Sequence, residues 1–301
     1  MAITVRIKVP GTTANCGPGF DAIGIACNIY NYLELTLDEA EKTNVHVEGE
    51  GAGVIPTDDR NIAVKAVRMV LKRVGFPLKG VKIKMNNNIP LARGLGSSAA
   101  AIVGGLVAAN EATGNTLTKQ DILDMATEIE GHPDNVAPAI YGGITVSVVE
   151  GSSHCLRFLP RKKLIMVVAV PEFTLSTQKA RQVLPQEISL KDAAFNVGRA
   201  SLLIGALCQE EYSLLKYAFK DKLHHPYRQE LIPGMEDVFK ASIDNGAHGA
   251  TISGAGPCLI AYTEQNANEV GKAMVKAFND NGVQAKILIL DIDEAGATAI
   301  A

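Results

Sequence analysis

The chain has 301 residues, of which 47% are hydrophobic and 20% charged, and its formal net charge is −3 at pH 7. This composition is typical of a globular protein with a large core and about two domains. It gives no basic surface for nucleic acid, and no apolar run approaches the roughly 18 uncharged residues of a membrane helix. The N-terminus alternates like a strand and lacks the apolar core of a signal peptide. We therefore expect small-molecule partners, no nucleic acid, no membrane and a cytoplasmic location.

Apolar periodicity predicts an α+β first half. The expected strands cover residues 3–10, 31–40, 44–51, 80–87 and 144–151, and the expected helices cover 61–74, a stretch from about residue 97, and 118–131. Proline and glycine punctuate residues 132–143, so a short loop is expected there.

The second half resembles a ferredoxin-like sandwich with an added helix. Strand patterns cover residues 164–171, 249–256, 257–263 and 285–292, and helical patterns cover 191–207, 234–246 and 267–282. We place the domain boundary near residues 157–163, which predicts an N-terminal domain over 1–158 and a C-terminal domain over 159–301.

The cysteines indicate neither a disulfide framework nor a zinc site, because they are odd in number, far apart and without a C-x-x-C pair. We expect them to be small core residues. They are Cys16, Cys27, Cys155, Cys208 and Cys258.

The stretch NNIPLARGLGSSAAAIVGGL, residues 87–106, places Gly94, Gly96 and the pair Ser97 and Ser98 between a strand pattern and an alanine-rich helix. A helix N-terminus leaves backbone N–H groups unpaired and carries a partial positive charge, which suits an anion. The run lacks the Gly-Lys-Ser/Thr ending of a Walker A loop and the ribose-binding acid of a dinucleotide fold. The residues alone leave two interpretations open: phosphate binding, or a tight turn with Ser97 as the N-cap.

The string PLARGLGSSAA, residues 90–100, resembles the phosphate-binding loop of the GHMP kinase superfamily. Two further blocks, TTANCGPGFDAIG at 12–24 and GATISGAGPCLIAY at 249–262, agree in order and spacing. The resemblance implies an α+β, two-domain kinase fold that uses ATP and Mg²⁺, with a mixed α/β N-terminal domain and a ferredoxin-like C-terminal domain. The implied ATP-binding residues are Pro90, Leu91, Ala92, Arg93, Gly94, Leu95, Gly96, Ser97, Ser98, Ala99, Ala100 and Asn61.

Within this superfamily, the segments 132–143, 176–181 and 226–228 are similar to the homoserine kinases. The similarity implies ATP-dependent phosphorylation of the L-homoserine hydroxyl, giving O-phospho-L-homoserine and ADP on the path to threonine, and it leaves a homodimer open. Two alternatives also stay open. One is a mevalonate-type or shikimate-type kinase, whose substrate has no ammonium group; the other is a nucleotide-binding regulator without turnover.

The similarity implies a substrate site with groups of opposite charge. Arg181 and Arg228 would each form two-point hydrogen bonds to the substrate carboxylate. Asp21 is the expected partner of the ammonium group, Asn15 would bind from the same turn, and Asp134 matches a family residue that contacts homoserine. Without the resemblance, the arginines would pair with surface acids and the Asp21 segment would be a turn with an Asx cap.

Asn135 occupies the position where galactokinase and mevalonate kinase relatives carry a catalytic aspartate. An amide cannot accept a proton as a carboxylate does, so the similarity implies direct transfer of the hydroxyl proton to the γ-phosphate. Thr177 and Arg228 are counted with Asn135 as catalytic residues, Thr177 because it resembles a residue near the transferred phosphoryl group. His132 is an alternative base, and residues 253–258 should line the active-site cleft.

Magnesium is expected because phosphoryl transfer needs charge neutralised between the β- and γ-phosphates. Ser98 matches the loop serine that contacts the metal and phosphate in relatives, and a glutamate on the next helix should complete the set. Glu128 fits the family position better than Glu130, so Glu128 is the predicted ligand. Without the resemblance, either acid would be expected on a solvated helix face.

Overall fold

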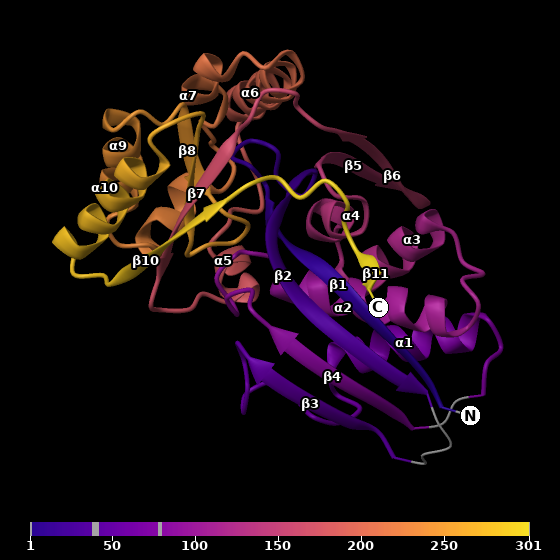
Figure 1. Ribbon diagram of the computed structural model, residues 1–301. Helices are drawn as coiled ribbons and strands as arrows, with labels where there is room; N and C mark the ends of the chain where they lie inside the picture. Colours follow the sequence, from indigo (N-terminus) through magenta and orange to yellow (C-terminus); the bar gives the residue numbers. More distant parts are fainter. Residues whose placement is uncertain (1, 38–41, 78–79, 301) are drawn as a thin grey trace.

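The chain builds two β-sheets with helices packed on them (Figure 1). The computed structural model describes residues 2–37, 42–77 and 80–300. Within these ranges no helix is long and apolar enough to cross a membrane.

The first sheet has seven strands, and its main path runs β11-β1-β2-β4-β3. β5 pairs with the start of β2, and β6 pairs with β5. All pairs are antiparallel except β3 with β4. The strands are β1 (Ile3–Ala14), β2 (Ile23–Leu37), β3 (Asn44–Gly49), β4 (Val81–Asn87), β5 (Ile144–Glu150), β6 (Ser152–Phe158) and β11 (Thr298–Ile300).

The helices of the first half are α1 (Ile62–Arg73), α2 (Ser97–Ala112), α3 (Lys119–Glu130) and α4 (Pro133–Tyr141). α2 and α4 contact β1 and β2, and α1 packs against α2. α2 is buried on almost every side because its residues are small or apolar, whereas α1 buries only an apolar stripe that includes Val64, Val67 and Leu71. The helices expected over 61–74 and 118–131 are therefore present, and the third begins at Ser97.

The second sheet has four antiparallel strands in the order β10-β7-β9-β8. In chain order this is the arrangement 4-1-3-2 of a ferredoxin-like sandwich, with helices between the first two and the last two strands, so that prediction is confirmed. α9 and α10 contact this sheet, and α6 contacts α7. The elements are β7 (Ile165–Pro171), α5 (Thr177–Gln182), α6 (Leu190–Gln209), α7 (Leu215–Ala218), α8 (His225–Arg228), α9 (Met235–Asp244), β8 (Gly249–Ile252), β9 (Leu259–Thr263), α10 (Ala267–Asp280) and β10 (Ala285–Leu290), with 3₁₀ turns at Tyr212–Leu214 and Gln229–Leu231.

One hydrophobic core joins the two sheets. It contains Ile25 and Leu35 of β2 together with Met166 of β7 and Ile260 of β9. The Cys27 thiol lies 3.9 Å from the Met166 sulfur. A second core lies where α9 and α10 pack on the other sheet and includes Val238. The main core is thus shared between the two halves of the chain.

The segment 132–143 is a helix where a short loop was expected. Pro133 occupies the first helical position, where its missing N–H costs no hydrogen bond. Pro138 lies inside α4 and cannot donate to the Asp134 carbonyl four residues earlier. That carbonyl lies against Gly24 of β2, where a Cβ would come within 1.8 Å of it. Gly24 therefore lets the start of α4 approach the sheet.

The last described strand, β11, has no counterpart in the expected elements. It pairs with β1 of the first sheet, so the chain crosses back after β10. The chain passes from the first sheet to the second between Phe158 and Ile165. The division into domains 1–158 and 159–301 stays a prediction, and β11 lies with the first of the two.

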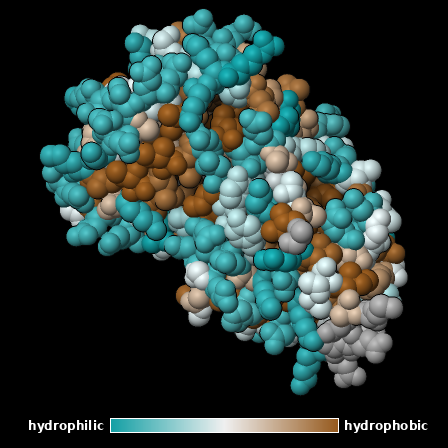
Figure 2. All heavy atoms as spheres, viewed as in Figure 1, coloured by the Kyte–Doolittle hydropathy of each residue, from teal (hydrophilic) through white to brown (hydrophobic). Residues whose placement is uncertain are grey.

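The cysteines divide by burial. Cys16, Cys27 and Cys258 are buried as expected, whereas Cys155 is half-buried and Cys208 is exposed on α6. The prediction that all are core residues is therefore wrong for Cys208, since its position lies on the outer face of that helix. Figure 2 shows a largely hydrophilic surface with a hydrophobic area over β7 and β10, where Ile289 is exposed.

Candidate active site

A single cavity brings together residues from all three sequence blocks. Its volume is about 450 Å³, which is within the range of small-molecule sites. Every residue from Pro90 to Ser98 lines it. The other polar or charged residues in its lining are Asn15, Asp21, Arg60, Asn61, Asn87, Glu130, His132, Asp134, Asn135, Ser176, Thr177, Arg181 and Arg228.

The glycine-serine loop ends in the N-terminus of α2. Gly96 is the residue before the helix, with φ of 71°, and it has no side chain to cap the helix. Ser97 is the first helical residue, so the interpretation of Ser97 as the N-cap is wrong. The first N–H groups of α2 lack a side-chain cap and stay available to an anion. Ala99 and Ala100 are buried in the first turn and do not line the cavity.

Thr12 of β1 holds the loop close to α4. A Cβ on Gly96 would lie 2.0 Å from the Thr12 hydroxyl oxygen, so glycine is required for this approach. The Thr12 backbone N–H donates to the Leu95 carbonyl at 3.0 Å. The Thr12 hydroxyl donates to Oδ1 of Asn135 at 2.8 Å. Thr12 thus connects the phosphate loop to the residue at the expected base position.

The second half of the chain braces the same loop. The Arg93 guanidinium donates to the carbonyls of Pro171 and Glu172 at 3.0 and 2.7 Å. The Ser253 hydroxyl contacts the Gly94 carbonyl at 2.6 Å and the Thr13 hydroxyl at 2.9 Å. Arg93 therefore uses its guanidinium to join the loop to the end of β7.

Asn61 lies at another part of the cavity, beside the apolar residues Ile55, Ile62 and Met85. Its Oδ1 accepts from the Ala63 N–H at 2.9 Å and caps α1. Its Nδ2 donates to the Pro56 carbonyl at 2.8 Å. The amide is therefore committed to the protein, and Asn61 shapes the lining through the position of α1.

Ser98 lies beside Glu130. The Ser98 hydroxyl donates to Oε2 of Glu130 at 3.1 Å, and both residues line the cavity. Burial raises the pKa of Glu130, and the nearby charges of His132 and Arg181 and the hydrogen bond from Ser98 offset this effect only in part. A hydroxyl and a carboxylate oxygen facing one cavity are ligands that Mg²⁺ accepts.

Glu128 lies elsewhere, in a separate hollow that also contains Lys72 and Arg73. Residues two apart on a helix are separated by about 200° around the axis, so Glu128 and Glu130 cannot face the same cavity. The placement of Glu128 beside Ser98 is therefore wrong, and Glu130 takes that position.

The start of α4 presents His132, Asp134 and Asn135 to the cavity. Nδ1–H of His132 donates to Oδ1 of Asp134 at 2.7 Å, and this hydrogen bond raises the pKa of His132. Asp134 is 1% exposed. The amide of Asn135 is 3.4 Å from the same Asp134 oxygen. Asp134 thus already has a cationic or neutral imidazole as its partner before any ligand binds.

Asp21 and Arg181 form an ion pair across the cavity. The two terminal nitrogens of Arg181 donate to the two Asp21 oxygens at 3.1 and 2.5 Å. The Asn15 side chain accepts from the Asp21 N–H and donates to the Gly254 carbonyl at 2.8 Å. The two charges were predicted to face different groups of the substrate, and in this structure they face each other.

Arg228 is 1% exposed yet lines the cavity. Nε donates to the Ala180 carbonyl at 3.2 Å, and Nη1 donates to the Gly254 carbonyl at 3.2 Å and to Nδ1 of His224 at 3.1 Å. Among the described residues, Nη2 has no hydrogen-bond partner. Burial lowers the pKa of Arg228 to about 10, so the guanidinium stays charged at neutral pH.

Comparison with known proteins identifies the family. The model of the GHMP kinase N-terminal domain matches residues 61–143, and the model of the GHMP kinase C-terminal domain matches 203–280. A homoserine kinase from Desulfitobacterium hafniense is 42% identical over 98% of this chain and all of that protein. One from Moorella thermoacetica is 44% identical over 98% of this chain and 99% of that protein. The chain belongs to the homoserine kinases of the GHMP superfamily.

Solved structures agree with this family assignment. A homoserine kinase from Cytophaga hutchinsonii has a TM-score of 0.91 and 30% identity, covering 99% of this chain and 98% of that one. A mevalonate kinase from L. major has a TM-score of 0.71 at 20% identity, covering 98% and 96%, and so shares the fold. The prediction that this chain has the GHMP kinase fold is confirmed.

In this member of the homoserine kinases, most of the predicted site residues line one cavity. Thr177 lies there too, at the start of α5, where Ser176 caps the helix. Sequence reasoning missed Thr12, Phe20 and His224. The Phe20 ring lies 5.3 Å from the Arg181 guanidinium and 5.6 Å from that of Arg228. The signals were local: Phe20 directly precedes Asp21, and His224 stands two residues before the PYR segment.

Proposed function

We propose that the protein is an L-homoserine kinase, which transfers the γ-phosphoryl group of ATP to the L-homoserine hydroxyl and releases ADP, a step in threonine biosynthesis. The observation that carries this proposal is the cavity. An uncapped helix N-terminus lies in the same cavity as Arg181, Arg228, Asp21 and Asp134, which suits a nucleotide together with an amino acid. The 40–44% identity to homoserine kinases over nearly the whole chain supports it.

ATP is expected to bind with its phosphates at the N-terminus of α2. Glycine at positions 94 and 96 lets the backbone approach the phosphates closely. The apolar lining near Asn61, which includes Ile55 and Met85, offers the adenine ring a place to pack.

Ser98 and Glu130 are proposed to hold Mg²⁺, because their oxygens lie together in the cavity beside the phosphate loop. When bound there, the ion neutralises charge on the β- and γ-phosphates. Glu130 replaces Glu128 in this proposal. Burial raises the pKa of its carboxyl group, and a bound cation would favour the charged form.

L-Homoserine has a carboxylate, an ammonium group and a hydroxyl. Arg228 is proposed to bind the carboxylate with Arg181, and Asp21 to bind the ammonium group with Asp134 and Asn15. Because Asp21 and Arg181 already bind each other, the substrate would exchange one ion pair for two, with its zwitterion inserted between the charges.

The transfer step is proposed to need no protein base. Oδ1 of Asn135 accepts the Thr12 hydroxyl, so the amide has a fixed orientation and positions groups without taking a proton. Nδ1–H of His132 donates to Asp134, and this hydrogen bond raises the pKa of His132, which favours the cationic ring that cannot accept a proton. The hydroxyl proton would then pass to the γ-phosphate as the oxygen–phosphorus bond forms and the bond to the ADP oxygen breaks. Thr177 lines the same cavity and is proposed to hydrogen-bond the transferred group.

The experiment is ADP release with ATP, Mg²⁺ and a matched set of acceptors: L-homoserine, 4-hydroxybutyrate without the ammonium group, 3-amino-1-propanol without the carboxylate, mevalonate and shikimate. We expect turnover with L-homoserine and a large loss for each truncated analogue. Preference for mevalonate or shikimate would reassign the substrate within the superfamily. Nucleotide binding without ADP release for any acceptor would indicate the regulator instead.

We also propose a cytoplasmic location, since the reaction consumes ATP, and a homodimer. β10 is an edge strand of the second sheet and exposes Ile289, which supports a contact between copies. Light scattering of the purified protein decides between a monomer and a dimer.

A further inference from the structure

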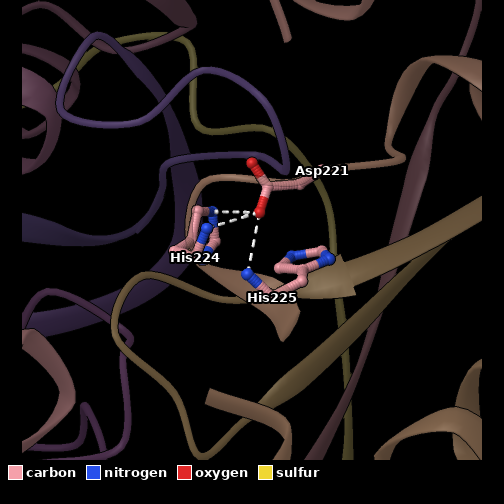
Figure 3. A group of neighbouring side chains, drawn as sticks. All are labelled: Asp221, His224 and His225. Atoms are coloured by element: carbon pink, nitrogen blue, oxygen red, sulfur yellow. Dashed lines mark hydrogen bonds and ion pairs between the residues drawn. The ribbon is translucent and has the colours of Figure 1, made fainter. Parts of the chain in front are cut away.

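Three residues outside the cavity lining form a buried polar cluster at the start of α8. Figure 3 shows Asp221 with both its neighbours, His224 and His225. Oδ2 of Asp221 accepts from the backbone N–H groups of His224 and His225 at 2.8 and 2.7 Å. Oδ1 accepts from Nδ2 of Asn196 at 2.7 Å. Asp221 therefore fixes the path of the backbone just before Arg228.

The cluster is not a metal site, although its possible ligand atoms lie within 4.8 Å of one another. Both Asp221 oxygens accept protein N–H groups. Nε2 of His224 is 3.8 Å from the nearer Asp221 oxygen, too far for a hydrogen bond, and has a different partner. A cation would have to displace the hydrogen bonds of the Asp221 carboxylate and of Nε2 of His224.

The His224 ring joins two elements of the substrate site. Nε2 lies 2.8 Å from the Gly17 carbonyl, which can only accept, so Nε2 carries the hydrogen. Nδ1 must then accept in the neutral ring, and it accepts from Nη1 of Arg228 at 3.1 Å. One neutral tautomer satisfies both contacts. Burial lowers the pKa of His224 to about 3, so the ring stays neutral at physiological pH.

We propose that His224 is a positioning residue that orients the Arg228 guanidinium and sets its distance from the turn that carries Asn15 and Asp21. This inference rests on the proposed function, in which Arg228 binds the substrate carboxylate and Asp21 the ammonium group.

Two further contacts link the same elements. The Gly254 carbonyl accepts both Nη1 of Arg228 and Nδ2 of Asn15. The Phe20 ring lies 5.4 Å from the His224 ring and also faces Arg228. Replacement of His224 therefore leaves the Gly254 hydrogen bonds and the Phe20–Arg228 contact in place but removes one partner of Nη1, so the guanidinium can turn toward a position that fits the carboxylate less well.

His225 is a matched control. It is adjacent in sequence and buried, and burial lowers its pKa to about 4. Among the described residues, no hydrogen bond joins its ring to Arg228; Nε2 faces Thr251 and the backbone of Ile252, on the side of β8. Replacement of His225 removes a buried imidazole of the same kind without touching the guanidinium.

The test compares His224→Gln, His224→Asn and His225→Gln. Gln places an amide near Nε2 and keeps the contact to Gly17, whereas Asn places an amide oxygen near Nδ1 and keeps the acceptor for Arg228. We expect His224→Gln to raise the KM for L-homoserine by about tenfold, the loss of one hydrogen bond to a charged group, with the KM for ATP unchanged. His224→Asn should raise it less, and His225→Gln should leave it within about twofold.

A homoserine KM within twofold of wild type for the folded His224 variants overturns the inference, as does an equal rise in His225→Gln. Should His224→Gln fail to fold, His224→Asn and the double variant His224→Asn/Arg228→Lys decide. Orientation through Arg228 requires the two changes to be non-additive in the homoserine KM, and additivity overturns it. Wild-type protein that does not phosphorylate L-homoserine overturns the proposed function and this inference together.

Discussion

The carboxylate of Asp21 binds the guanidinium of Arg181 through two hydrogen bonds, 3.1 and 2.5 Å long. These bonds connect the segment 12–24 to α5. Both side chains remain about one-third exposed in the cavity. Each charge is therefore held ready in the ligand-free protein, and a zwitterion can replace the internal partner of both.

Asp21→Asn tests this exchange. We expect the KM for L-homoserine to rise at least about tenfold, because the ammonium group loses its charged partner. The competitive inhibition constant of 4-hydroxybutyrate should not rise, because Arg181 is released from its ion pair. Equal weakening of both ligands would contradict the assignment of Asp21 to the ammonium group.

Glu130→Gln, with Glu128→Gln as the matched control, tests the metal site. The two acids lie on the same helix, and only Glu130 lies beside Ser98. We expect Glu130→Gln to lower kcat/KM for MgATP at least about 100-fold, since a charged ligand is lost, and Glu128→Gln to change it little. Titration of activity with Mg²⁺ should show that Glu130→Gln alone needs a higher Mg²⁺ concentration for half-maximal activity. A larger loss in Glu128→Gln than in Glu130→Gln would show that Glu128 is the metal ligand.

Asn135→Asp tests the absence of a protein base. A well-placed general base is worth about 10² to 10⁴ in rate, so a gain of that size would show that direct transfer to phosphate is wrong. We expect no such gain, because the new carboxylate would repel the phosphates and would lie beside Asp134. His132→Gln should keep measurable kcat, and its profile of kcat against pH should lose no essential ionisation.

The buried histidines predict a stability that falls on the acid side of neutrality. His225 has a pKa of about 4 in the folded protein, below its ordinary value of 6.5, so only the unfolded chain binds a proton between these values. Its contribution to the free energy of unfolding is constant above pH 6.5 and decreases by up to about 1.4 kcal/mol per pH unit below it.

Urea unfolding of wild type and His225→Gln between pH 7.5 and 4.5 measures this effect. The difference in the free energy of unfolding between the two proteins should narrow as the pH falls, because the variant has no imidazole to protonate there. The lowered pKa of Asp221 acts in a lower range, near and below its ordinary value of 3.8. A difference that stays constant with pH would show that the pKa of His225 is the same in the folded and unfolded protein.

The sequence predicted the elements that have a clear local pattern or belong to a family motif. The helix that begins at Ser97 and the ferredoxin-like order of the second half follow from periodicity and turn residues. β11 was missed because three residues are too few to show a period. α4 was missed because proline and glycine locally favour a loop, whereas burial against β2 favours the helix.

The sequence predicted which residues belong to the site better than it predicted how they are arranged there. The pairing of Asp21 with Arg181 joins positions 160 residues apart, and the contact of His224 with Gly17 joins positions 207 apart. Neither leaves a periodic trace in the sequence. The choice between Glu128 and Glu130 depends on the rotation of α3 relative to Ser98, which is set by the packing of α3 on α2 and α4. A sequence motif identifies candidate residues but does not determine the rotation of the helix that carries them.

The core shared by β2, β7 and β9 limits how the enzyme can open. Rotation of the two sheets apart would separate Ile25 and Cys27 from Met166 and Ile260 and expose apolar surface. Close-packed interiors resist such sliding. We therefore expect substrates to enter and products to leave through local movement of segments at the cavity mouth, such as the one that carries Thr177 and Arg181, while the two halves keep a constant mutual orientation through the catalytic cycle.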